Sequence, residues 1–410
     1  MQRIVQKFGG SSVATAEKLR HVASKIAHTR RSGAGVVVVV SAMGKTTDEL
    51  LGLAARVSDR PMPRELDLLL ASGEQISSSL LAMAVQNQGQ EAVALTGAQS
   101  GIVTSDGHGG AKVTDVQPDR ILDELDQGRV VVVAGFQGLN PSDEVATLGR
   151  GGSDTSAVAL ASALDAGECQ IFTDVAGVYS ADPRVVPSAR CIERIDYEQM
   201  LALAHHGARV LHAEAVELAQ RDEVIVQVRS TFSDAGGTRV GPAESDLQGV
   251  PVSGIAGRQD LLAIIGHGSE LEARVLDRAH SEAGTDRDVL WHEPVGADRR
   301  FRLLVASQNM PDPEAFAGRL TEEMEVDVVG DLGSVSVVGR QLERHADLHE
   351  RVGPLSDQAL HNYSTPVSLS WLLRAPHVDE VSRHLHEALV EPAFAPSLSA
   401  GAPRATSVPA

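Results

Sequence analysis

A segment at 147–164, TLGRGGSDTSAVALASAL, places an arginine between glycines directly before an alanine-rich helical pattern. Arg150 carries a planar guanidinium, which can hold a carboxylate or a phosphate through two parallel hydrogen bonds. The amides of the two glycines after it, at the start of a helix, attract the same negative charge. Ser153 or Asp154 could cap this helix, and Asp154 could instead accept an ammonium group. Because an arginine opposes the helix dipole at this end, the segment predicts a receptor for an anion as well as a helix start.

A second candidate for anion binding is the loop KFGGSS, which begins at Lys7. Gly9 and Gly10 allow backbone N–H groups to approach an anion closely, and Lys7 adds a mobile positive charge. The glycines could equally form a tight turn beside a surface lysine, because the loop lacks the GxxxxGKS pattern.

Two more polar segments follow predicted strands. SAMGKTTDELL begins at Ser41 directly after a run of valines, and its Thr47 lies near a helix start. Helix capping explains a threonine there, but it gives no reason for a serine at the end of a buried strand. FTDVAGVYSADPR combines a strand end, an aromatic ring that could face a purine, and an acid–base pair on a proline turn. Its candidate side chains are Thr173, Asp174, Tyr179, Asp182 and Arg184.

Two groups of titratable residues have simpler interpretations. Glu74 is expected to open a long apolar helix, where the helix dipole alone favours a glutamate. His205, His206 and His212 lack an acidic partner pattern, so we expect solvated histidines at helix ends and no metal held by the protein.

The elements that must position these residues alternate between strands and helices. Unbroken valine runs at 35–40 and 129–135 are typical of parallel strands that are buried on both faces. The remaining strands are expected at 3–8, 91–95, 169–175 and 223–230, and the helices at 15–31, 48–58, 64–88, 118–127, 153–166, 196–205 and 211–221. This order predicts an α/β domain with a mainly parallel central sheet and helices on both faces. Since ligands of such sheets bind beyond the carboxyl ends of the strands, the polar segments should converge there.

The order of predicted strands and helices changes in the second half of the chain. We assign 1–235 to the first domain, 236–250 to a linker, 251–392 to two α+β modules and 393–410 to a low-complexity, disordered tail. The modules are expected to contain strands at 252–257, 260–266, 300–306, 333–339 and 366–375, with helices at 269–283, 312–324, 341–352 and 377–391.

Composition narrows the class of protein. The formal net charge of −19 argues against a nucleic-acid partner, which requires a basic face. Two cysteines without CxxC spacing make a disulfide framework or a zinc site improbable. We find no secretion signal and no apolar run of membrane-spanning length, so we expect a cytoplasmic protein without a membrane partner.

Taken in order, the motifs VQKFGGSSV, SAMGKTTDELL, ASGEQIS, VVVVAGFQG, TLGRGGSDTSAVALA, FTDVAGVYSADPR and VRSTFSD resemble those of the aspartate kinase family. The resemblance covers residues 3–235 and implies the amino-acid kinase fold, followed by tandem ACT-like modules. It implies transfer of the ATP γ-phosphoryl group to the β-carboxylate of L-aspartate, the first step of aspartate-family amino-acid biosynthesis, with Mg²⁺ carried on the nucleotide phosphates.

The resemblance also implies a role for each motif. Lys7 and Asp154 would be catalytic, with Lys7 bridging the transferring phosphoryl group. Aspartate would be bound by Thr47, Glu74, Arg150, Gly151, Gly152 and Ser153. ATP would be bound by Lys7, Gly9, Gly10, Ser11, Ser41, Thr173, Asp174, Tyr179, Asp182, Arg184 and Arg209.

Several positions depart from the family pattern. Arg209 stands where a lysine is usual, and Lys45 stands where the family loop is often acidic or neutral. The ACT-like region lacks the family's acidic-x-Pro-Gly turn, so we expect weak or altered inhibition by lysine and threonine. We expect a homodimer or higher homo-oligomer through these modules. Two alternatives are a kinase of the same fold for another acidic amino acid and a catalytically silent ACT-type regulatory subunit.

Overall fold

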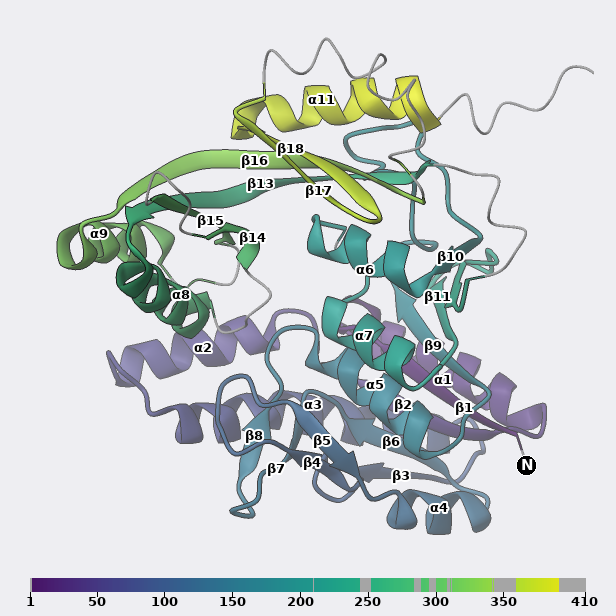
Figure 1. The fold of residues 1–410 in the computed structure, drawn as a ribbon. Coiled ribbons are helices and arrows are strands. Elements are labelled where there is room, and N and C mark those ends of the chain that lie inside the picture. The colour runs from purple at the N-terminus through teal and green to yellow at the C-terminus, as the bar shows by residue number, and fades with distance from the viewer. Residues whose placement is uncertain are drawn as a thin grey trace, which may run out of the picture.

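The computed structural model has two parts, each built on its own large sheet (Figure 1). The structure describes residues 2–208, 210–243, 252–283, 289–294, 300–307, 310, 312–340, 342 and 359–390.

The first part contains an eight-stranded sheet in the order β10-β12-β11-β9-β1-β2-β6-β3. Its strands are β1 Arg3–Phe8, β2 Gly35–Val40, β3 Ala92–Leu95, β6 Val130–Ala134, β9 Glu168–Thr173, β10 Arg194–Asp196, β11 Val226–Ser230 and β12 Thr238–Gly241. All neighbouring pairs are parallel except β11 with β12. Every residue of β2 and β6 is buried, so the prediction made from the valine runs is confirmed.

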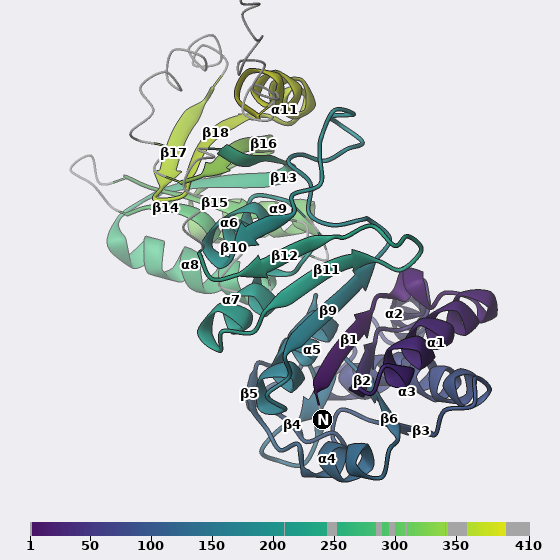
Figure 2. The ribbon, with the colours of Figure 1, turned by 90° about the vertical axis from the view of Figure 1, so that its right-hand side faces the viewer.

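Helices cover both faces of this sheet (Figure 2). On one face, α1 (Ala16–Arg31) and α3 (Pro63–Gln86) pack on Val36, Val38 and Val40 of β2. On the other face, Val37 and Val39 join a core formed with four further helices. Those helices are α4 Asp119–Asp126, α5 Gly152–Ala163, α6 Tyr197–His205 and α7 Ala213–Arg221. The alternation of valine side chains along one strand therefore fills both cores.

Two features of the first part differ from prediction. A second sheet forms in the order β5-β4-β7-β8, from strands too short to give a periodic signal. These strands are β4 Ile102–Thr104, β5 Val113–Val116, β7 Gln137–Leu139 and β8 Val145–Thr147. The predicted linker begins too early, because β12 belongs to the large sheet. Thr238 is buried there, and its hydroxyl donates to the Ile192 carbonyl at 2.6 Å.

The second part is a six-stranded antiparallel sheet in the order β14-β15-β13-β16-β18-β17. Its elements are β13 Val252–His267, α8 Ser269–Ala283, β14 Val289–Glu293, β15 Arg300–Ala306, α9 Pro313–Met324, β16 Asp327–Gly339, β17 His361–Thr365, β18 Ser368–Arg374 and α11 Val378–Leu385, followed by a π turn, His386–Val390.

The prediction of separate strands at 252–257 and 260–266 is wrong. β13 is one continuous strand that pairs with β16 on either side of a register shift between Arg258 and Leu261. The arginine at that point stays in the strand because its side chain is buried in an ion pair with Asp260. The predicted helix 341–352, apart from residue 342, and the tail 393–410 lie outside the described residues.

Two arginines of the second part form hydrogen bonds at the two ends of α6. At the start of α6, Arg340 donates to Asp196 at 2.9 Å, and at its end Arg258 donates to the His205 carbonyl at 3.0 Å. The next residue, His206, is buried and its Nε2 lies 3.1 Å from Ser368 Oγ, so the prediction of a solvated histidine is wrong there. Burial lowers the pKa of the His206 imidazole to about 3, so the ring is neutral at physiological pH.

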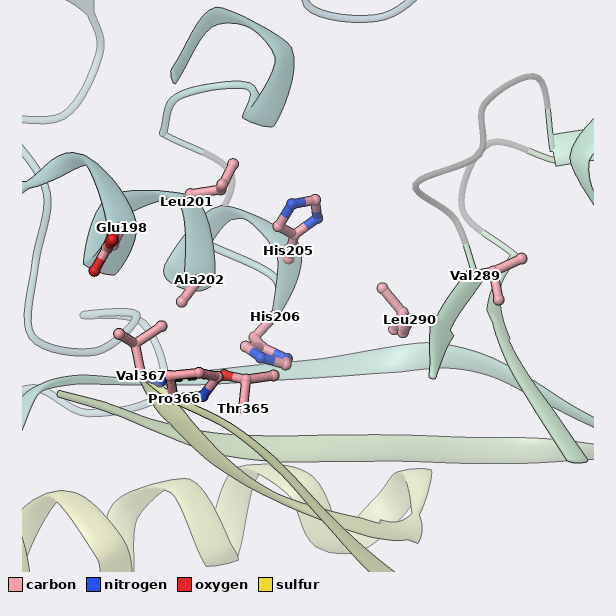
Figure 3. Close-up of a pocket in the computed structure, with 10 residues that line it drawn as sticks. All are labelled: Glu198, Leu201, Ala202, His205, His206, Val289, Leu290, Thr365, Pro366 and Val367. Atoms are coloured by element: carbon pink, nitrogen blue, oxygen red, sulfur yellow. Dashed lines mark hydrogen bonds between the residues drawn. The ribbon is translucent and has the colours of Figure 1, made fainter. Parts of the chain in front are cut away.

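A cavity of about 530 Å³ lies between α6, β14 and the turn at 365–367 (Figure 3). Its described lining is mainly apolar and includes His205 and His206. None of the described residues that line it belongs to the predicted substrate site.

The prediction that no apolar run is long enough to span a membrane is wrong for α3 by length and composition alone. Half of its most apolar window is buried in the protein, however, and its inner face carries the buried carboxylates Asp67 and Glu74. Buried carboxylates on the inner face are properties of a helix that packs in a protein core.

Candidate active site

The predicted catalytic residues meet at the carboxyl edge of the central strands. Lys7 lies near the end of β1 and Asp154 lies in the first turn of α5, and Lys7 Nζ is 2.6 Å from Asp154 Oδ1. Both side chains are largely buried, with 12% and 11% of their surface exposed. Two opposite charges that are partly removed from water attract strongly, so each fixes the position of the other.

The start of α5 differs from the predicted cap. Gly151 occupies the N-cap position with φ 74°, and no side chain caps the helix. Ser153 and Asp154 lie inside the first turn and are buried. A β-carbon on Gly151 would stand 2.1 Å from the His212 ring, so this position requires glycine for both its backbone angle and its space. The Gly152 and Asp154 amides donate to the Gly149 and Gly151 carbonyls at 3.1 and 2.9 Å, so among the described residues the Ser153 amide is the first-turn donor left for an anion.

The loop after β1 lies against the loop after β2. A short 3₁₀ turn, η1, spans Gly10–Ser12, and the Gly44 amide donates to the Gly10 carbonyl at 3.1 Å. A β-carbon on Gly10 would stand 2.6 Å from the Ala42 carbonyl oxygen, so a larger residue would separate the loops. The Ser41 amide donates to the Phe8 carbonyl. This bond places Ser41, as predicted, beside the segment 7–12, which we call the glycine loop.

Glu74 is not at the start of a helix, as the sequence suggested, but in the interior of α3. Its Oε1 accepts the Ala42 amide at 2.8 Å. Its Oε2 is buried and has no hydrogen-bond partner among the described residues. Burial raises the pKa of the Glu74 carboxyl from 4.5 to about 7, while the Ala42 amide acts in the opposite direction. A buried carboxylate oxygen without a donor is suited to a ligand that brings one.

This raised pKa predicts a pH-dependent stability. The folded protein retains the Glu74 proton up to about pH 7, whereas the unfolded chain loses it near 4.5, so stability falls between these values. Relative to Glu74→Gln, the ligand-free protein should lose roughly 3 kcal/mol of unfolding free energy over that range. Urea unfolding of both proteins at pH 4.5, 6 and 8 measures the difference. A difference that is constant with pH would contradict the buried, protonated carboxyl.

The remaining nucleotide candidates lie after β9. Thr173 donates to Asp174 at 3.0 Å, and Arg184 pairs with Asp182 at the surface. The pKa of Arg184 is raised, first by its hydrogen bond to Asp182, and the charge of Asp174 acts in the same direction. Tyr179 is half-buried and forms a β-bridge with Cys191. Arg209 lies outside the described residues.

Two predicted substrate residues lie at the rim. Arg150 is exposed in the segment 148–153, which we call the Arg150 loop. Thr47 lies in the first turn of α2 (Thr46–Val57), a helix without a buried residue. Neither makes a side-chain hydrogen bond or ion pair to the described residues, so both are available to a ligand.

Sequence reasoning missed the residues that support this loop. Asp67 is buried in α3 and accepts from Thr147, Gly109 and His108. The detectable signal was its spacing of seven from Glu74, which places two acidic residues on the same face of an apolar helix.

The described residues contain no group of three or more His, Cys, Asp or Glu that could hold a metal ion. Cys169 and Cys191 are both free thiols, and burial raises the pKa of the Cys169 thiol.

Comparison with known proteins agrees with this geometry. The model of the amino acid kinase family matches residues 2–230. The chain is 40% identical over 414 residues to the aspartokinase of Mycolicibacterium smegmatis, covering 95% of this chain and 96% of that one. It is 52% identical to aspartokinase 2 of Bacillus subtilis over 62% of this chain and 63% of that one.

The fold has close counterparts among solved structures. E. coli aspartokinase III in complex with aspartate and ADP superposes with a TM-score of 0.79 at 23% identity, covering 95% of this chain and all of that one. Aspartate kinase from Synechocystis gives a TM-score of 0.55 at 33% identity, covering 94% of this chain and 69% of that one. The chain therefore belongs to the amino acid kinase family and, within it, to the aspartokinases.

Proposed function

We propose that this chain transfers the γ-phosphoryl group of ATP to the β-carboxylate of L-aspartate, forming 4-phospho-L-aspartate. The observation that carries the proposal is the Lys7–Asp154 pair, which lies between the glycine loop and the Arg150 loop at the carboxyl edge of the sheet. A full positive charge at this point can lie between two anionic substrates.

The reaction needs positioning more than acid–base catalysis. The β-carboxylate of aspartate, with a reference pKa of about 3.9, is already ionised at neutral pH and attacks the γ-phosphorus without a general base. Its oxygen forms the new P–O bond while the bond to the ADP oxygen breaks, and Lys7 neutralises charge on the transferring group. Mg²⁺ carried on the nucleotide phosphates would supply further positive charge. The glycine-loop amides and Ser41 hold the phosphates.

The aspartate backbone would be recognised by opposite charges. Arg150 holds the α-carboxylate through its two-pronged guanidinium, next to the start of α5, which no side chain caps. The ammonium group donates to Asp154 and to the partnerless oxygen of Glu74. The adenosine of ATP would lie against the segment after β9, which contributes Thr173, Asp174, Tyr179, Asp182 and Arg184.

We assign the second part of the chain, with its six-stranded sheet, to an ACT-like regulatory and dimerisation region. Its departures from the family's effector motifs support weak or altered inhibition by lysine and threonine.

The test is formation of aspartyl hydroxamate by the full chain with aspartate, Mg-ATP and hydroxylamine. We expect product with aspartate and little with glutamate. The same assay with added lysine or threonine measures feedback inhibition. No product above that of a Lys7→Ala control would overturn the proposed function. Half-inhibition by submillimolar lysine would overturn the assignment of weak regulation.

A further inference from the structure

We propose that Asp67 and His108 are positioning residues that set the geometry of the Arg150 loop and thereby the affinity for aspartate. This inference rests on the proposed function. It concerns the buried carboxylate of α3 and the segment 105–111, which we call the His108 loop.

Asp67 joins three parts of the chain. Its side chain is 1% exposed and accepts the Thr147 amide at 3.0 Å, the Thr147 hydroxyl at 2.5 Å and the Gly109 amide at 3.0 Å. His108 Nδ1 lies 3.1 Å from the same carboxylate. A carboxylate offers about four lone-pair positions, so this group is saturated by protein donors. It therefore acts on the structure and not directly on a ligand.

Thr147 is the last residue of β8, three residues before Arg150. Its carbonyl accepts the Ala111 amide at 2.8 Å, so Asp67 and the His108 loop hold it from two sides. A β-carbon on Gly149 would stand 3.5 Å from the Gly110 α-carbon, which shows that the two loops lie in contact. The start of the Arg150 loop is thus fixed by the His108 loop.

His108 extends this support to a third segment. Its Nε2 lies 3.3 Å from Glu144, whose other oxygen accepts from Arg64 at 2.6 Å. The hydrogen bond from Arg64 is the main cause of the lowered pKa of the Glu144 carboxyl, so this acceptor stays ionised. The His108 ring therefore connects α3 to the turn between β7 and β8.

The contacts of Asp67 and His108 should affect the binding of aspartate more than the binding of ATP. Asp67 and Glu74 share the inner face of α3, and Glu74 lies next to the proposed ammonium position while Asp67 holds the strand that leads to Arg150. The spacing between the carboxylate and ammonium receptors thus depends on Asp67. The glycine loop, which is attached to β1, does not depend on it.

Steady-state kinetics of the full chain test the inference. In Asp67→Asn and His108→Ala, the KM for aspartate should rise about tenfold or more, while the KM for ATP stays within about twofold. Thr147→Val should have the same effect, and Thr147→Ser, which keeps the hydroxyl, should restore nearly normal kinetics. Glu124→Gln is the matched control, because Glu124 is a buried carboxylate of α4 that pairs with Arg120 of the same helix and with Arg129, which follows the helix.

Hydrogen exchange supplies a readout that does not depend on activity. The amides of 147–153 should exchange faster in His108→Ala than in the parent or in Glu124→Gln. Unchanged exchange there, or equal rises in the KM for aspartate and ATP, would overturn the inference. If Asp67→Asn does not fold, His108→Ala decides, because its ring is partly exposed on a loop. An inactive parent protein would overturn the proposed function instead, and hydrogen exchange would still decide this inference.

Discussion

Lys7→Ala should lower kcat for aspartyl phosphate formation by about three orders of magnitude, the effect of losing a charge that stabilises a transition state. The lysine Nζ lies 2.6 Å from Asp154 in a largely buried position, so no water or neighbouring cation replaces it at that point. The loss should fall on kcat, because the substrates keep their other contacts in the glycine and Arg150 loops. Initial rates of hydroxamate formation measure it.

Two further variants separate charge from shape. Lys7→Arg keeps the charge but cannot place it at one point, so it should restore only a small part of the rate. Removing the lysine also leaves Asp154 buried without its partner, so Lys7→Ala combined with Asp154→Asn should recover thermal stability without recovering activity. If Lys7→Ala alone retained more than a tenth of the parent rate, Lys7 would have a structural role and not a catalytic one.

Arg150→Ala should raise the KM for aspartate about 100-fold, the value expected for a lost two-pronged bond to a carboxylate. The melting temperature should hardly change, since Arg150 is exposed and forms no side-chain hydrogen bond within the described chain. Kinetics with varied aspartate at saturating ATP, together with thermal unfolding, measure both quantities.

The matched control is Arg31→Ala, which removes an exposed arginine from the last turn of α1. It should leave the KM for aspartate unchanged. If Arg150→Ala instead lowers the melting temperature and spares the KM, the arginine supports the loop and does not bind the substrate.

The central sheet was predictable because its strongest signals are local. Five successive valines, as in β2, are typical of a strand buried on both faces, and its parallel pairing with β1 brings Lys7 and Ser41 to the same edge. The site residues could be placed at that edge because parallel strands end together.

Other features depend on contacts that a linear sequence does not encode. Gly151 replaces the expected side-chain cap because His212, distant in sequence, fills the space of a β-carbon. The helix itself was predicted at 64–88, but Glu74 was assigned to a helix start from the helix dipole alone, whereas it lies in the interior of α3. The β4 and β8 strands are three residues each, and they exist because partner strands and Asp67 hold them.

Strand β13 has a mechanical consequence. It is 16 residues long, lies in the middle of the six-stranded sheet, and carries Arg258, which donates to the carbonyl at the end of α6. A bend within this sheet would therefore have to deform β13, whose pairing with β16 is already shifted between Arg258 and Leu261. α6 is its point of attachment, and the chain continues from α6 to His212, which rests on Gly151. A continuous series of contacts thus joins the sheet of the second part to the Arg150 loop.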